Sequence, residues 1–240
     1  MSAVAGSRRV VVAGVAGGVG TTTVTALLFT TLSGDSSPRL VDHSGGDLGA
    51  RLTGGDDAGR VDRSLSLHDL GAHADGALID LLAEPDVFGV VVGPTTEAGT
   101  ADVRRVLEKV RERHGSGGLR RILVVVVGTF GQHSTARAEE ALQNEFGRRS
   151  LVVVPRDPAL AAGGRVPLNR VNAESRRAQG TLASYLRERL VSHAGATTTA
   201  PPPVAPGSSP PVSPGGVPGE APAGPAGGPV DGPGLSPPAR

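Results

Sequence analysis

The sequence predicts an α/β domain with a doubly wound, mostly parallel sheet and flanking helices, followed by a disordered tail rich in Pro, Gly and Ala. Short runs of Val and Leu alternate with stretches of helical character, which is typical of α/β folds. Such continuous apolar runs are expected of strands buried on both faces. The composition changes abruptly near residue 195. We therefore expect a domain over residues 1–194 and a tail over residues 195–240.

The expected elements follow from the apolar patterns along the chain. The segment 45–63 is rich in Gly and Asp, lacks periodicity and is predicted to be a loop. Strands are expected at 9–13, 39–42, 64–68, 87–92, 121–127 and 151–154, and helices at 21–32, 75–82, 100–113, 135–146 and 174–191.

The tail holds 14 of the 20 prolines and shows no apolar periodicity. Too little apolar surface is available there to offset the entropy of ordering, so polyproline II character without a packed core is expected. Proline-rich segments dock in aromatic-lined grooves, which suggests a protein partner. A solubilising tether is the alternative.

Composition excludes several classes of protein. With no Cys in the chain, disulfide frameworks, thiolate metal sites and Cys nucleophiles are ruled out. No apolar run approaches the roughly 18 residues of a membrane helix, so we expect a cytoplasmic protein without an integral membrane segment. A net charge of +1 and 2% aromatic residues give no specific nucleic-acid signal.

The most informative segment is VVVAGVAGGVGTTTVTALL, a predicted strand that leads through four glycines into three threonines and an apolar helix. Gly permits close backbone approach, so successive N–H groups can converge on an anion at the helix N-terminus. The loop therefore predicts phosphate binding, by Gly17, Gly18, Gly20, Thr21, Thr22 and Thr23.

One interpretation is a dinucleotide site, since the loop also reads G-x-x-G-x-x-G from Gly14 and Asp42 stands about where a ribose-binding acid would. The loop resembles that of extended short-chain dehydrogenases. Their chemistry uses a Tyr with a Lys four residues on, whereas here Tyr185 is followed by Arg189 and Lys109 is far away. A non-catalytic dinucleotide-binding module stays open.

A second interpretation starts from AGGVGTTT, residues 16–23, which resembles the deviant Walker A loop KGGxGKTT of the ParA/MinD ATPases. The segment LVDHSGGDL resembles the family's second strand, whose Asp positions the attacking water, and here that residue is Asp42. SLSLHDLG, residues 64–71, resembles the Walker B strand, which ends in Asp69. VVVPRDPAL resembles the family segment beside the adenine, here Pro155 to Asp157. The resemblance covers residues 8–190.

This resemblance implies a P-loop NTPase-like fold and a site for ATP or ADP with Mg²⁺. Asp42 and Asp69 take the catalytic positions, and Thr22 and Asp69 the magnesium positions. The nucleotide-binding positions are Gly17, Gly18, Gly20, Thr21, Thr22, Thr23, Pro155 and Asp157.

The sequence departs from the family at the two loop positions where the family carries positive charge. Ala16 and Thr21 stand in place of the two loop lysines, and Lys109 is the only Lys in the chain. Each lost charge-assisted contact forfeits roughly 1.5 to 3 kcal/mol. Arg156 and Arg165 are the candidate replacements by position.

We therefore expect a weak or inactive ATPase that acts as a scaffold or switch in intracellular positioning, such as chromosome or plasmid partitioning, division-site placement, or pilus or secretion machinery. A working Mg-ATPase with an Arg or partner-supplied cation, and a pure interaction module, are the alternatives. Without the lysine at Ala16, a homodimer should not be driven by ATP. His43, His68 and His73 match no zinc ligand spacing, so satisfied or solvent-facing histidines are expected.

Overall fold

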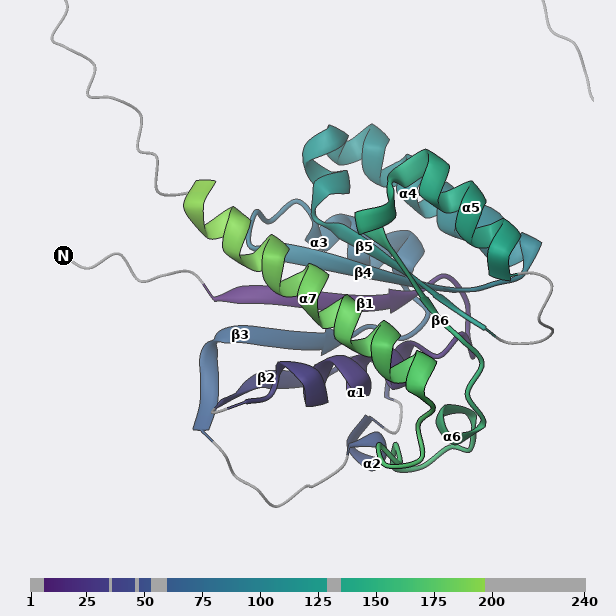
Figure 1. The fold of residues 1–240 in the computed structure, drawn as a ribbon. Helices are drawn as coiled ribbons and strands as arrows, with labels where there is room; N and C mark the ends of the chain where they lie inside the picture. Colours follow the sequence, from purple (N-terminus) through teal and green to yellow (C-terminus); the bar gives the residue numbers. More distant parts are fainter. Residues whose placement is uncertain (1–6, 35, 46–47, 53–59, 129–134, 197–240) are drawn as a thin grey trace, which may run out of the picture. The chain divides into compact units, whose positions relative to one another are not determined.

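Six parallel strands form one sheet in the order β2-β3-β1-β4-β5-β6, as seen in a computed structural model of the chain (Figure 1). The structure describes residues 7–34, 36–45, 48–52, 60–128 and 135–196. The strands are β1 (Arg8–Gly14), β2 (Ser36–Asp42), β3 (Arg60–Asp69), β4 (Val87–Pro94), β5 (Ile122–Val127) and β6 (Leu151–Val154).

Helices connect successive strands, so all strands point the same way and their carboxyl ends share one edge of the sheet. The described helical segments are α1 (Thr21–Leu32), α2 (Leu48–Arg51), η1 (Ala74–Leu78), α3 (Ile79–Leu81), α4 (Glu97–Arg120), α5 (Thr135–Phe146), η2 (Arg148–Ser150), α6 (Pro158–Ala161) and α7 (Ala173–Ala196).

The central strand β1 contributes side chains to two cores, because its side chains alternate between the faces of the sheet. Val10 and Val12 pack in the core that contains residues of α1 and α7. Val11 and Ala13 pack on the other face with residues of α3, α4 and α5. In Figure 1, α1 and α7 lie on one side of the sheet, and α4 and α5 lie on the other side. The predicted doubly wound parallel sheet with flanking helices is confirmed.

Several element predictions were wrong in detail. The segment 45–63 contains α2 and the start of β3 as well as irregular chain. The predicted helix at 75–82 begins irregularly, with non-helical backbone at Asp75 and Gly76. The helix predicted at 100–113 is longer, extending as α4 to Arg120 with a break at Gly115, where φ is +62°.

The last described helix, α7, continues to Ala196, so residues 195 and 196 of the predicted tail are helical. The remainder of the predicted tail, residues 197–240, lies outside the described residues. None of the helices that the structure describes has the length and apolar character needed to cross a bilayer.

Candidate nucleotide site

The glycine loop joins β1 to α1 at the carboxyl edge of the sheet. Gly18 (φ +74°) and Gly20 (φ +93°) adopt left-handed backbone conformations that favour glycine. Gly20 is the N-cap of α1 and supplies no side-chain cap. The first N–H groups of this 12-residue helix therefore face the loop, where an anion can accept from them.

Thr21 lies beneath the loop rather than over it. Its side chain is 7% exposed, and a Cβ at Gly14 would collide with the Thr21 hydroxyl and with Val19. Ala16 is exposed on the loop. The two positions that carry lysine in the resembling family therefore leave this loop without charge, and its phosphate affinity has to come from backbone N–H groups.

Asp69 ends β3 and pairs in register with Val12 of β1 and Asp42 of β2. Its side chain is fully buried. Oδ1 accepts the N–H of Gly71 at 2.9 Å, whereas Oδ2 has no hydrogen-bond partner among the described residues. A buried acceptor without a partner is costly, and it marks a place where a ligand or ion fits.

The charge of Asp69 is only partly compensated. Burial raises the pKa of Asp69 above the ordinary carboxylate value, and the negative charge of Asp42 raises it further. The Gly71 N–H, the Thr22 hydroxyl and the charge of His43 act in the opposite direction. A cation beside Oδ2 would stabilise the ionised form, which is the form that can act as a ligand.

This oxygen set fits Mg²⁺. Carboxylate and hydroxyl oxygens are ligands that the ion prefers, and it commonly completes its shell with water and substrate phosphates. Within the described part of the chain, no three His, Cys, Asp or Glu residues gather into a metal site of their own. Thr22 and Asp69, predicted as the magnesium residues, are thus brought together by the α1 N-terminus and the end of β3.

Asp42 lies next to this pair but is exposed. Its Oδ1 accepts from the backbone N–H of Ser44 at 2.9 Å and from the Ser44 hydroxyl at 2.7 Å. The turn holds the carboxylate at the open edge of the site, where it can accept a hydrogen bond from a water molecule.

His43 and His68 lie along the same edge. Nε2 of His43 and Nδ1 of His68 share a hydrogen bond of 2.9 Å, and Nε2 of His68 contacts the Ser66 hydroxyl at 2.9 Å. Burial lowers the pKa of His68 to about 4, with smaller contributions from the positive charges of His43, Arg9 and Arg39. At neutral pH His68 is therefore uncharged and supplies no cation to the site.

The segment after β6 forms the far side of the site. Asp157 is the N-cap of α6, and its Oδ1 accepts from Ala159 N at 2.9 Å. Its Oδ2 accepts from Asn172 N at 2.8 Å, and the side chain is 5% exposed. Because both carboxylate oxygens accept backbone N–H groups, Asp157 fixes the shape of the segment that begins at Pro155.

A cavity of about 280 Å³ joins this segment to the glycine loop. The structure brings together five predicted site residues in its wall, Gly18, Gly20, Thr23, Pro155 and Asp157. Thr22, Asp69 and Asp42 lie outside this wall as a second group, while Gly17 is exposed on the loop.

Two arginines line the cavity. Arg51 of α2, which was not predicted, donates from Nη1 to the Leu160 carbonyl at 3.2 Å and is held at the wall. Arg156 also lines the cavity. Arg165 is exposed, donates to the Leu52 carbonyl at 3.2 Å and does not line the cavity. Of the two arginines suggested by the sequence, only Arg156 reaches this wall.

Comparison with known proteins gives matches among solved structures alone. No protein-family model matches the chain, and no curated protein matches it.

A ParA family ATPase from Chlorobium tepidum TLS matches with 14% identity and a TM-score of 0.48, over 78% of this chain and 98% of that one. A putative plasmid partition protein from Borrelia burgdorferi B31 bound to AMPPNP matches with 13% identity and a TM-score of 0.45, over 76% and 99%. A nucleotide-binding protein from Archaeoglobus fulgidus in complex with ADP matches with 16% identity and a TM-score of 0.44, over 73% and 88%. ParA family ATPases and partition proteins are thus among the solved structures that this chain resembles in fold.

Proposed function

We propose that this chain is a ParA/MinD-like protein that binds adenine nucleotides weakly, hydrolyses ATP slowly or not at all, and serves as a scaffold or switch in intracellular positioning. The observation that carries the nucleotide site is the cavity between the glycine loop and Pro155–Asp157, with the unpaired Oδ2 of Asp69 on the other side of the loop. The positioning role rests on the motif resemblance.

In this proposal the base and ribose lie in the cavity, against the wall formed by Thr23, Pro155 and Asp157. The phosphates lie over the loop, where backbone N–H groups and the α1 N-terminus donate to them. Thr22 and Asp69 would hold Mg²⁺, which neutralises phosphate charge when bound. Asp42 accepts a hydrogen bond from the attacking water and orients it.

The missing lysines decide how well this site works. Each absent charge-assisted contact costs about ten- to a hundredfold in affinity. Catalysis of phosphoryl transfer depends mostly on positioning and on charge stabilisation of the equatorial oxygens, so turnover suffers more than binding. An uncharged loop therefore favours a nucleotide-responsive or nucleotide-independent scaffold over an efficient enzyme.

Calorimetric titration with ADP, ATP and NAD, with and without Mg²⁺, tests the proposal. We expect weak adenine nucleotide binding that Thr21→Lys strengthens about tenfold or more, since a cation returns to the phosphate site. Thr181→Lys, which adds the same charge at an exposed position of α7, is the matched control and should leave affinity unchanged. Preferential NAD binding, or no nucleotide binding by either Thr21 form, would overturn it.

A working Mg-ATPase is the second candidate, because two arginines, Arg51 and Arg156, line the cavity. Such an enzyme would turn over ATP with Mg²⁺ above a Thr22→Ala control, and Arg51→Ala would lower that turnover while Arg165→Ala would not. Equal rates in the wild type and the Thr22→Ala variant would refute this second candidate.

A further inference from the structure

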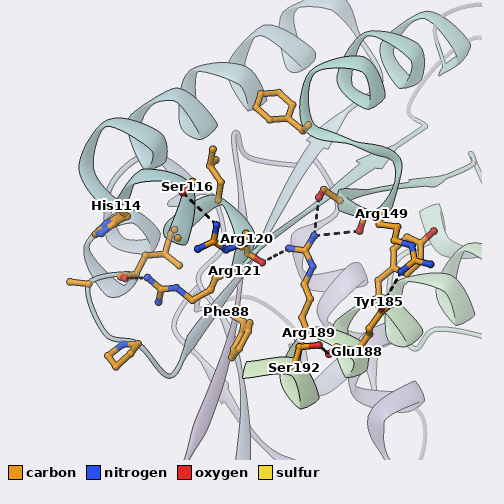
Figure 2. A pocket seen from close by; sticks show the side chains of 18 residues that line it. Phe88, His114, Ser116, Arg120, Arg121, Arg149, Tyr185, Glu188, Arg189 and Ser192 are labelled. Carbon is orange, nitrogen blue, oxygen red and sulfur yellow. Dashed lines mark hydrogen bonds and ion pairs between the residues drawn. The ribbon is translucent and has the colours of Figure 1, made fainter. Parts of the chain in front are cut away.

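A second, larger cavity of about 900 Å³ lies at the other edge of the sheet from the glycine loop (Figure 2). Phe88 near the start of β4, Arg121 before β5 and Ser150 before β6 line it, so it opens at the amino ends of these strands. The end of α4 and the face of α7 from Tyr185 to Ser192 complete the wall. A ligand here is remote from the nucleotide site.

The charge of the wall is strongly positive. Arg120, Arg121, Arg149 and Arg189 line the cavity, and Glu188 is the only carboxylate among its lining residues. In Figure 2, Arg120 lies beside Ser116, and Arg149 lies near Tyr185 and Glu188, with Arg189 between them. The positive charges are therefore distributed along the cavity instead of converging on one point.

Arg121 and Arg189 are fixed in place by neutral acceptors. Arg121 donates to the carbonyls of Leu82 and Glu84, both at 2.6 Å, and of Val87 at 3.1 Å. Neither Arg121 nor Arg189 forms an ion pair with a carboxylate within the described part of the chain. The partners of Arg189 are the carbonyls of Arg120, Ile122 and Arg149 and the Ser150 hydroxyl.

Burial lowers the pKa of both guanidinium groups, against weaker stabilisation by Asp86 for Arg121 and by Glu188 for Arg189. Folding therefore places two desolvated positive charges at a cavity wall, and no carboxylate of the described residues forms an ion pair with either of them. A negative group brought to this wall would compensate them without the cost of ordering flexible side chains.

The outer cations can contact a ligand directly. Arg120 is exposed, and its one described side-chain bond is a long one, 3.5 Å to the Ser116 hydroxyl. Arg149 pairs with Glu188 at 3.0 Å, with 79% of the Arg side chain exposed. Both side chains are exposed, so their guanidinium groups can rotate toward the carboxylates of a ligand in the cavity.

Between the cations the wall is apolar. Phe88, Phe146 and Tyr185 line the cavity, which is three of the five aromatic residues of the chain. Phe88 is only 2% exposed and presents no open face on which a nucleic-acid base could stack. This pattern fits an apolar side chain flanked by negative charges.

From this combination we propose that the cavity docks an acidic peptide segment of a partner protein, with an apolar side chain against Phe146 and Tyr185 and carboxylates on Arg120 and Arg149. Arg121 and Arg189 contribute fixed positive charge. The distribution of the cations favours an extended peptide over a compact anion such as phosphate. This site is independent of nucleotide binding at the glycine loop.

The chain carries its own reporter for the test. Tyr185 is the only Tyr and there is no Trp, so intrinsic tyrosine emission comes from this cavity alone. The full chain is titrated with the peptide acetyl-DDEFEELG-amide, which has neither Tyr nor Trp. We expect a saturable change in Tyr185 emission, which weakens as salt is added. Two control peptides should bind at least about tenfold more weakly than the acidic peptide. They are the basic acetyl-KKKFKKLG-amide and acetyl-DDESEESG-amide, which lacks the apolar side chains.

Charge reversal locates the site. Arg120→Glu combined with Arg149→Glu should weaken binding of the acidic peptide at least about tenfold, because two attractive contacts become repulsive. Arg111→Glu combined with Arg177→Glu, at exposed positions of α4 and α7 that do not line the cavity, changes the charge equally, is the matched control and should bind as the wild type does. No emission change up to about 1 mM peptide, equal weakening by the control variant, or tighter binding of inorganic phosphate or single-stranded DNA would each overturn the proposal.

Discussion

Replacing Asp69 with Asn should stabilise the protein without nucleotide and impair the site. The Asp69 side chain is fully buried, and only one of its carboxylate oxygens has a hydrogen-bond partner among the described residues. Asn has the same shape and keeps an acceptor for the Gly71 N–H, and its amide NH₂ takes the place of Oδ2. The variant therefore removes a desolvated charge and gives the unpaired position a donor.

The size of the gain follows from the cost of an unpaired buried group. Leaving a buried acceptor unsatisfied costs about 1–3 kcal/mol, and more when it is charged. We expect Asp69→Asn to raise the free energy of unfolding at pH 7 by about 1–3 kcal/mol. In a domain of this size each kcal/mol corresponds to about 2–4 °C in the thermal midpoint.

The gain should depend on pH in a defined direction. Folding raises the pKa of Asp69, so above the ordinary carboxylate pKa of about 4 the folded state binds more protons than the unfolded state. The wild type then loses stability as pH rises through the raised pKa of Asp69, and the Asn variant does not. The difference between the two proteins is small near pH 4 and grows toward pH 7.

Thermal and denaturant unfolding of both proteins between pH 4 and pH 7, without nucleotide, measure this difference. Asp42→Asn is the control, since Asp42 is exposed and hydrogen-bonded to Ser44, and it should change stability by less than about 0.5 kcal/mol. A wild type more stable than Asp69→Asn at pH 7 would refute the reasoning, because it would show that the carboxylate is fully compensated in the folded protein.

Other expectations concern the loop, the edge histidine, the capping aspartate and assembly. Gly20→Ala should destabilise by about 1 kcal/mol, measured by denaturant unfolding, because φ is +93°, whereas Gly17→Ala should be neutral because a Cβ there meets nothing within 4 Å. The pKa of His68 is about 4 in the folded protein against 6.5 ordinarily, so stability is lost as pH falls from 6.5 to 4. His68→Gln should reduce that loss by about 1 kcal/mol, because the side chain is only partly buried, and an unchanged pH profile would contradict this. Asp157→Asn should lower the free energy of unfolding by about 1–2 kcal/mol in the same assay, because an amide NH₂ would face a backbone N–H; a neutral effect would argue against the cap. Because Ala16 stands in place of the lysine, light scattering should show the same oligomeric state with and without Mg-ATP. A shift from monomer to dimer on adding Mg-ATP would contradict the prediction that the uncharged loop prevents dimerisation driven by ATP.

The strands and most of the long helices could be predicted because their signals are local. Continuous Val and Leu runs define β1, β4, β5 and β6, and the Gly-rich turn into α1 has a direct backbone reason in Gly18 and Gly20. The pairing of Thr22 with Asp69 was expected only through the resemblance. Sequence spacing alone does not tell which strand ends are neighbours.

The parts that were missed depend on tertiary contacts. The short helix α2 has no periodicity to detect, and it is held because Leu48 is buried in the core. The only local signal for this helix is the four-residue spacing between Leu48 and Leu52. The positive cavity is equally invisible in the sequence, because Arg121 and Arg189 come from segments that meet only in the folded chain.

The central claim is that an adenine nucleotide binds in the cavity between the glycine loop and Pro155–Asp157. Ala161 is exposed at the end of α6 and lines this cavity, whereas its neighbour Ala162 is exposed and does not. Titration of Mg-ADP into the wild type, Ala161→Trp and Ala162→Trp therefore tests the claim most directly. We predict that the indole at 161 blocks the cavity and lowers affinity at least about tenfold, while Ala162→Trp binds as the wild type does; equal affinity in all three proteins, or no binding to the wild type, would contradict the claim.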